Sequence, residues 1–161
     1  MGVWEGRLLH LSYGTGRLFV ITPDQEAPLP QGTAIPLEIK TEVPLLHARM
    51  HPSGQAVYLA GFALYGSRVA HDWSLGRLRP GPSPTTTAVS ARTVRDGIVL
   101  EFAHPLDPAS LTPEHVQLRG GNYLRSAAYG SGRYAMDGSP GATRLGAAQV
   151  VLSREQHSVF V

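Results

Sequence analysis

Short runs in which apolar and polar residues alternate cover most of the chain, and each run ends at a turn rich in glycine or proline. The first two runs, residues 6–12 and 17–22, are joined by a glycine-rich turn at residues 13–16. Leu9 and Leu11 share one face of the first run, and alternating residues from Leu18 to Thr22 share one face of the second, because successive side chains point to opposite sides of a strand. The pattern predicts two strands joined as a hairpin.

The same alternation continues to residue 79, after a polar loop predicted at residues 23–34. Further strands are predicted at residues 35–40, 45–50, 56–61 and 73–79. Pro36 places its strand at a sheet edge or at the start of the strand, since proline has no N–H for a ladder. Two interpretations fit residues 1–79: a propeller-blade-like antiparallel segment or a small antiparallel sheet.

Three prolines within residues 80–84 mark the clearest break in the pattern. A stiff, extended linker is predicted at residues 80–87, which separates the first segment from a second domain at residues 88–161. In that domain a hairpin is predicted around Asp96 and Gly97. Short helical turns are predicted before His115, with Thr112 and Pro113 as a helix start. The remaining predictions are strands at residues 116–119 and 122–128, a loop at 129–147, and a final hairpin of residues 149–152 and 158–161.

No segment keeps an apolar period of 3.6 residues over a dozen positions, so the expected fold class is all-β. The 161 residues, 42% of them hydrophobic, suffice for one domain of ordinary size or two small ones. No apolar run approaches the length of about 18 residues that a membrane span needs. No transmembrane segment is therefore expected in this chain. The chain also begins directly with a strand pattern, without the architecture of a signal peptide.

The basic residues are unusual in kind but not in number. The formal net charge is +2, and Lys40 is the only lysine among 14 basic residues. Arginine suits interface contacts, but the base composition of the genome explains the bias equally well. The arginines are spread along the chain without a basic stripe, so no nucleic-acid partner is expected.

The sequence predicts no catalytic, cofactor-binding or metal site, and no small-molecule substrate. The chain lacks cysteine, which excludes disulfides, thiolate catalysis and cysteine-based zinc or haem sites. His47 and His51 have helical metal-site spacing, but they fall in a strand and a turn. His71 is followed by Asp72, with no nucleophile motif nearby. Asp137 and Ser139 suit a turn better than a calcium loop.

A stretch rich in tyrosine and arginine near residues 119–136 is the candidate protein interface, because both residue types are frequent in binding hot spots. Its members are Arg119, Tyr123, Arg125, Tyr129, Arg133, Tyr134 and Met136. Two other interpretations stay open: these side chains cover the end of a sandwich core, or they stack on single-stranded nucleic acid.

Two resemblances add a family context. Residues 97–119, with the sequence GIVLEFAHPLDPASLTPEHVQLR, resemble the opening of a bacterial Ig-like domain. A longer likeness covers the GRLF strand at residues 16–19, the RMHPSGQAVY hairpin at 49–58, the LDPA turn at 106–109 and the NYLRSAAYGS loop at 122–131. These segments resemble the C-terminal region of large extracytoplasmic bacterial proteins that join a β-propeller, of the sorbosone or quinoprotein glucose dehydrogenase kind, to a β-sandwich and often to a haem-binding cytochrome c domain.

The resemblance implies the last strands of a propeller followed by an Ig-like β-sandwich without its last strand, in a periplasmic or otherwise extracytoplasmic compartment. No quinone-binding, calcium-binding or haem-binding residue of that family matches this sequence. The expected function is therefore a non-catalytic accessory or docking subunit that binds another protein in a larger assembly, with a redox, photosynthetic or respiratory membrane complex as one host. The alternative is the C-terminal fragment of a quinone-dependent sugar or alcohol dehydrogenase whose active site lies outside this chain. A carbohydrate-binding sandwich would need exposed aromatic residues on one face of the second domain.

Overall fold

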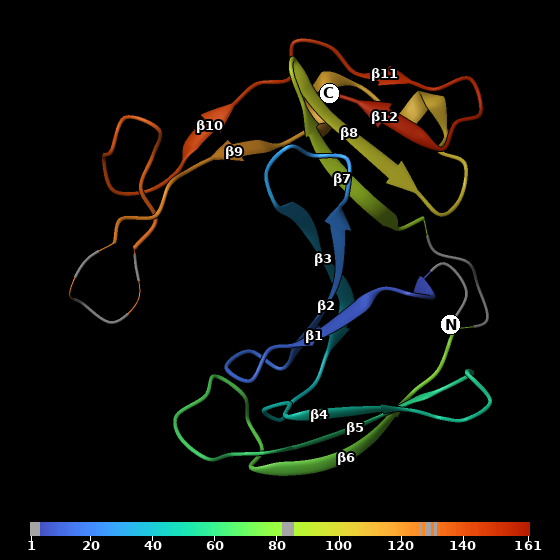
Figure 1. Cartoon of the computed structure of the whole chain (residues 1–161), viewed down its shortest axis with the longest axis vertical. Helices are drawn as coiled ribbons and strands as arrows, with labels where there is room; N and C mark the ends of the chain where they lie inside the picture. The colour runs from blue at the N-terminus through green and yellow to red at the C-terminus, as the bar shows by residue number, and fades with distance from the viewer. Residues whose placement is uncertain (1–3, 82–85, 126, 128–129, 131) are drawn as a thin grey trace. The chain divides into compact units, whose positions relative to one another are not determined.

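The computed structural model describes residues 4–81, 86–125, 127, 130 and 132–161. Within these ranges the protein is all-β, with several small antiparallel sheets, none of them closed, and with no α-helix (Figure 1). The predicted fold class is confirmed at this level. The chain divides into two compact units, Met1–His104 and Pro105–Val161, which are described separately.

The first sheet of the Met1–His104 unit contains β1 (Leu8–Leu11), β2 (Arg17–Asp24) and β3 (Gln31–Lys40), in the order β1-β2-β3. Leu18, Val20 and Thr22 are buried together on one face of β2, as their alternation predicted. Pro36 pairs with Phe19 from the edge strand β3, which is the position predicted for it.

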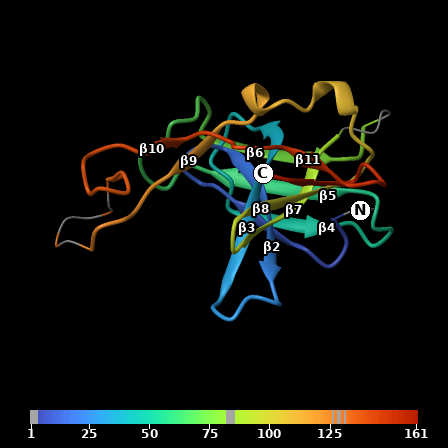
Figure 2. The same cartoon turned by 90° about the horizontal axis from the view of Figure 1, so that it is seen from above.

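The loop predicted at residues 23–34 is wrong over half of its length. β2 and β3 remain paired until Asp24 meets Gln31, so the connection shrinks to residues 25–30, and the two strands form a long hairpin (Figure 2). The pairing of β1 with β2 ends at Ile21. Pro23 therefore lies in a part of β2 that is paired with β3 alone, where a missing N–H costs little.

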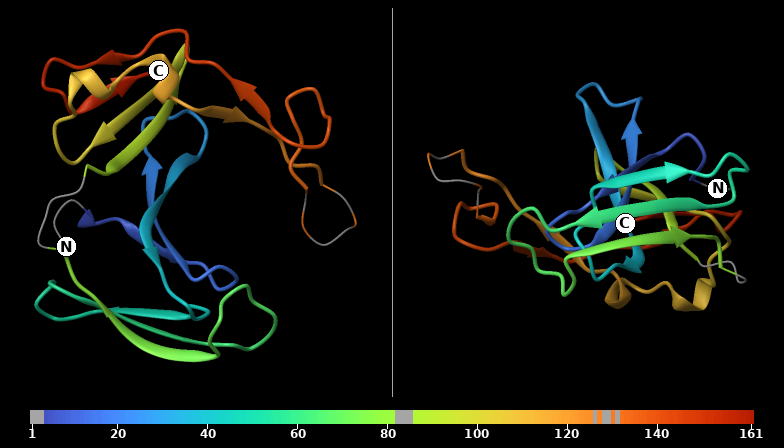
Figure 3. Two further views of the ribbon diagram at one scale, coloured as in Figure 1. Left: turned by 180° about the vertical axis from the view of Figure 1, so that it is seen from behind. Right: turned by 90° about the horizontal axis from the view of Figure 1, so that it is seen from below.

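The second sheet of this unit contains β4 (His47–Met50), β5 (Val57–Phe62) and β6 (Trp73–Leu78), in the order β4-β5-β6. All three strands and the turn between β4 and β5 were predicted. The right-hand view of Figure 3 shows the three strands side by side, in teal, green and yellow-green. Val57 and Leu59 of β5 join the core of the unit, which also contains Leu18, Val43 and Leu45.

Tyr13 anchors the irregular connection between β5 and β6, residues 63–72. Its hydroxyl group donates to the Tyr65 carbonyl oxygen at 2.6 Å and accepts from the amides of Leu64 and Tyr65 at 2.7 and 2.8 Å. The rings of Tyr13 and Tyr65 lie 4.5 Å apart. One side chain, 51 and 52 residues away along the sequence, thus holds the start of the connection, and the Arg68 and His71 amides donate to the carbonyl oxygens of Gly14 and Glu42 further along it.

Replacing Tyr13 with phenylalanine should loosen this connection while keeping the ring contact. Loss of the hydroxyl leaves the Leu64 and Tyr65 amides to water, and we expect a cost of about 1 kcal/mol because these groups are exposed. Hydrogen exchange measured by NMR should be faster at both amides, whereas Tyr123→Phe in the other unit should leave them unchanged. Unchanged exchange in Tyr13→Phe would show that the hydroxyl does not anchor the connection.

A hairpin of β7 (Ala88–Val94) and β8 (Gly97–Phe102) completes this unit. Its turn residues are Arg95 and Asp96, one position earlier than predicted, because Gly97 already pairs with Val94. The Thr22 hydroxyl donates to the Val89 carbonyl oxygen at 3.1 Å, which ties the hairpin to β2. Residues 82–85 of the predicted linker lie outside the described residues, and the domain boundary at residues 80–87 stays a prediction.

The described residues of the Pro105–Val161 unit form two single-turn 3₁₀ helices and two pairs of short antiparallel strands. The elements are η2 (Pro108–Ser110), η3 (Pro113–His115), β9 (Leu118–Gly120), β10 (Thr143–Leu145), β11 (Val151–Leu152) and β12 (Ser158–Phe160). β9 pairs with β10 and β11 with β12, both antiparallel. The helical turns after residue 106 and the last hairpin were predicted.

Three predictions in this unit are wrong. The strand expected at residues 116–119 begins only at Leu118, and residues 122–125 of the next expected strand form just one isolated bridge, between Asn122 and Tyr134. The loop expected at 129–147 contains β10. The double glycine lies where β9 ends: a Cβ atom on Gly121 would lie 3.0 Å from the Tyr134 carbonyl oxygen, so the chain there is packed closely against another backbone segment.

Candidate protein-binding face

The second sheet of the Met1–His104 unit has one face turned to solvent. Residues that are directly paired across neighbouring strands share a face. Tyr58 is paired with Arg49 on one side and Arg77 on the other, Ala60 with His47 and Leu75, and Phe62 with Trp73. We call this set the aromatic face: His47, Arg49, Tyr58, Ala60, Phe62, Trp73, Leu75 and Arg77.

Large apolar side chains of the aromatic face are unusually exposed. Trp73 is 77% exposed, Leu75 74% and Phe62 50%. On the opposite side of β5, Val57 and Leu59 are at most 5% exposed and belong to the core. The central strand is thus apolar on both sides, but only one side is covered, and a contiguous exposed apolar patch of this kind is typical of an interaction site.

The aromatic face is also positively charged at one end. Arg49 and Arg77 are exposed on either side of Tyr58, and β4, β5 and β6 contain no aspartate or glutamate. Asp72 precedes β6 and borders the opposite, apolar end. The sheet therefore presents guanidinium groups next to one aromatic ring, followed by an apolar surface.

The turn between β4 and β5 fixes the basic end of the face. The His51 amide donates to the Ala56 carbonyl oxygen at 2.8 Å, and the His51 Nδ1 atom lies 2.8 Å from the Ser53 hydroxyl. The His51 ring is 6.0 Å from the Tyr58 ring. This short turn sets the register that places Arg49 directly opposite Tyr58.

The candidate interface predicted from the sequence lies in the Pro105–Val161 unit. Arg119 is exposed in β9, Arg125 and Arg133 are also exposed, and Tyr134 is half-buried. Tyr123 and Met136 are 76% and 62% exposed, and Tyr129 lies outside the described residues. The structure pairs the backbone of Tyr134 with that of Asn122 and places the Met136 side chain beside Gly120. These residues stay candidates for a second contact.

Asp137 belongs to the turn that follows Met136. Its carboxylate accepts hydrogen bonds from the Ser139 hydroxyl at 2.7 Å and from the Ser139 amide at 2.9 Å. These two bonds, the hydroxyl bond first, lower the pKa of Asp137 below its ordinary value. The carboxylate is thus used to close a turn, as its neighbourhood in the sequence suggested.

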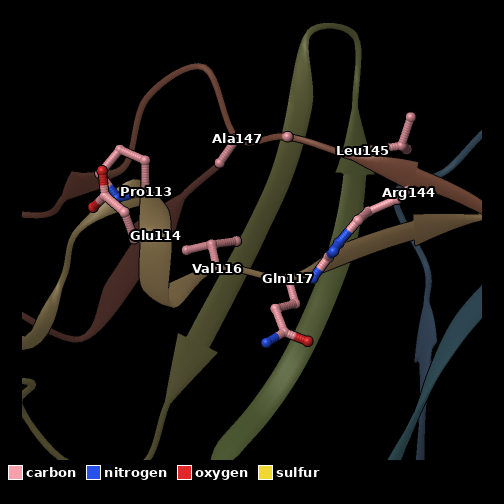
Figure 4. A pocket seen from close by; sticks show the side chains of 8 residues that line it. Pro113, Glu114, Val116, Gln117, Arg144, Leu145 and Ala147 are labelled. Carbon is pink, nitrogen blue, oxygen red and sulfur yellow. The ribbon is translucent and has the colours of Figure 1, made fainter.

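An open groove of about 470 Å³ lies in the same unit (Figure 4). Its lining residues are Pro113, Glu114, Val116, Gln117, Arg144, Leu145, Gly146 and Ala147. A hydrogen bond from the Thr112 hydroxyl is the main cause of a lowered pKa at Glu114. The lining offers one carboxylate, one amide and one guanidinium, without a serine, cysteine or histidine as nucleophile or base.

Among the described residues, no group of three or more histidine, aspartate or glutamate side chains could hold a metal ion. His47 lies on the aromatic face, and His71 contacts Glu42 at 3.1 Å. In the described part of the chain, no helix has the length and hydrophobicity to cross a membrane.

No protein-family model matches the chain, and neither a curated protein nor a solved structure matches it. By its fold, the chain is an all-β protein of small antiparallel sheets, one of which exposes an aromatic face.

The aromatic face was not recognised from the sequence, although β6 carried a signal. Trp73 and Leu75 alternate there with Ser74 and Gly76, so the large and small residues fall on opposite faces. This alternation predicted a strand but not which of its two faces is buried. The structure places the small residues inside and the large ones outside.

Proposed function

We propose that this chain is a non-catalytic docking module that binds another protein through the aromatic face. The observation that carries the proposal is the exposure of Trp73 and Leu75, which are 77% and 74% exposed on a sheet whose central strand is buried on its other side. Covering a large apolar side chain contributes about 2 kcal/mol, so a partner that covers this face gains most of the affinity of a protein interface from a few residues.

The proposal includes a setting. The chain acts as an accessory subunit or module in a larger extracytoplasmic assembly, of which a redox, photosynthetic or respiratory membrane complex is one example. Residues 97–119, through their likeness to a bacterial Ig-like domain, and the likeness of residues 16–19 and 49–58 to propeller-containing proteins support this setting. An Ig-like sandwich in the C-terminal half is part of the same proposal.

Site-specific crosslinking in the native cells tests the docking role. A photoreactive benzoylphenylalanine introduced at Leu75 should give one defined crosslinked protein, identified by mass spectrometry. The matched control is Leu29, which is 75% exposed and lies in the connection between β2 and β3. Crosslinking at position 29 should give no product.

The same experiment can contradict the proposal. If positions 75 and 73 give no crosslinked protein, or the same diffuse products as position 29, the aromatic face does not bind a protein partner. A crosslink of the chain only to itself would contradict it equally, because the bound partner would then be a second copy.

A further inference from the structure

We infer that the partner of the aromatic face is an acidic protein segment, in which a large apolar anchor is followed by carboxylates at a fixed distance. The inference rests on the proposed function and adds the chemistry of the partner. It comes from the way in which β4, β5 and β6 separate charge from apolar surface.

The basic end of the face provides two guanidinium groups in one row. Arg49, Tyr58 and Arg77 are paired directly across three neighbouring strands. Strands lie about 4.8 Å apart, so the Cα atoms of the two arginines are on the order of 10 Å from each other with an aromatic ring between them. Guanidinium groups bind carboxylates through two parallel hydrogen bonds, which makes a pair of carboxylates the matching chemistry.

The apolar end lies at the other end of the same strands. Phe62 and Trp73 are paired directly, and Leu75 follows on the same face of β6. Tyr58 and Phe62 are four residues apart on β5, which corresponds to about 13 Å along a strand. An extended partner segment that places an aromatic or aliphatic anchor over Phe62, Trp73 and Leu75 therefore reaches the arginines with carboxylates about four residues away.

Other occupants fit less well. In a second copy, the same face would bring Arg49 and Arg77 of both molecules into one interface without a carboxylate on any of the three strands, and uncompensated like charges oppose association. Single-stranded nucleic acid prefers aromatic platforms with cations along the whole backbone path. Here the aliphatic Leu75 occupies the middle row, and the arginines gather at one end.

The test uses three synthetic ten-residue peptides. The first carries two phenylalanines at alternate positions and, four residues further on, two glutamates; the second has lysines in place of the glutamates; the third has alanines in place of the phenylalanines. Binding is measured by anisotropy of a fluorescein label and by the emission of Trp73 in a Trp4→Phe background, since the chain has two tryptophans. The acidic apolar peptide should bind at least tenfold more tightly than the other two at low ionic strength, with a blue shift of Trp73 emission.

Two double variants distinguish the effect of charge on the aromatic face from the effect of the net charge of the chain. Arg49→Glu with Arg77→Glu should reverse the preference, so that the lysine peptide binds better than the acidic one. Arg95→Glu with Arg154→Glu changes the net charge by the same amount at two exposed positions outside the aromatic face and should leave the preference unchanged. Circular dichroism confirms that both variants remain folded.

The outcomes distinguish the inference from the proposed function. If both phenylalanine peptides bind equally well and Leu75→Ser abolishes both, the face binds protein without charge selection, so the inference fails and the docking role stands. If no peptide binds at millimolar concentration, the inference fails, and crosslinking at Leu75 decides the docking role. Binding of labelled oligo(dT) that is lost in the Trp73→Ala variant would overturn both the inference and the docking role in favour of nucleic acid. A dimer in sedimentation that Leu75→Ser dissociates would overturn both in favour of self-association.

Discussion

Replacing Gly61 with alanine should unfold the sheet that carries the aromatic face. Gly61 is buried in the central strand β5, and a Cβ atom there would collide with the Pro44 carbonyl oxygen and lie 2.8 Å from the Pro44 carbonyl carbon and 3.2 Å from Leu45 Cα. All three are backbone atoms, and Pro44 is itself fully buried, so no flexible side chain can move away. The Leu46 amide also donates to the Ala60 carbonyl oxygen at 3.0 Å, which holds the segment in place.

We expect Gly61→Ala to lower the free energy of unfolding by about 3 kcal/mol or more, at the upper end of the range for overpacked cores. Urea denaturation followed by circular dichroism measures this change. Gly76→Ala is the matched control, because Gly76 lies in the neighbouring strand β6 and a Cβ atom there meets no heavy atom within 4 Å. The control should be neutral or stabilising by up to about 1 kcal/mol. Equal destabilisation by the two variants would contradict the close approach at Gly61.

The strands of the Met1–His104 unit could be predicted because their signal is local. Leu18, Val20 and Thr22 alternate with exposed residues, and this period of two is visible in a single sequence and determines which side chains share a face. The end of the β2–β3 hairpin was missed for a reason that is not local. Pro23 is tolerated because β1 has already ended, and the length of a neighbouring strand is not encoded at the proline itself.

The aromatic face could not be predicted, because alternation does not say which side of a strand is buried. On the inner side of the sheet, Gly61 is paired with Ser74 and Leu59 with Gly76. Pro44 lies against Gly61, which leaves no room for a side chain at that position, whereas a Cβ atom on Gly76 would meet no heavy atom within 4 Å. The large residues of β6 lie on the outer side, against the usual preference for buried apolar side chains.

The positive charge of the aromatic face could not be predicted from the sequence for a similar reason. Arg49 and Arg77 are separated by 27 residues along the chain and become neighbours of one tyrosine only through the register of three strands. A spread of arginines along a sequence thus says little about their distribution on the surface of a β-protein. The scatter of the arginines was used only to argue against a nucleic-acid partner, and it does not exclude a smaller basic site that strand pairing brings together.

Replacing Leu18 with alanine should destabilise the whole Met1–His104 unit, because Leu18 lies where its two three-stranded sheets share a core. Leu18 is completely buried in β2, and its cluster includes Val57 and Leu59 of β5 as well as Val43 and Leu45. Truncation of a fully buried leucine leaves a cavity and costs about 2–5 kcal/mol. We expect a value in the upper half of this range, since rigid sheets on both sides limit collapse into the cavity. Urea denaturation measures the loss.

Leu29→Ala is the matched control for this change, since Leu29 is 75% exposed outside the strands, and it should alter stability by at most about 0.5 kcal/mol. A loss of less than about 1 kcal/mol in Leu18→Ala would mean that the two sheets do not share a core.

The result of the Leu18→Ala experiment also bears on binding. If the sheets unfold together, the aromatic face is held by a core on its inner side even though no described residue of the unit covers Trp73 and Leu75 outside. The aromatic face is then exposed on a stably folded sheet, and a preformed docking surface requires such a sheet.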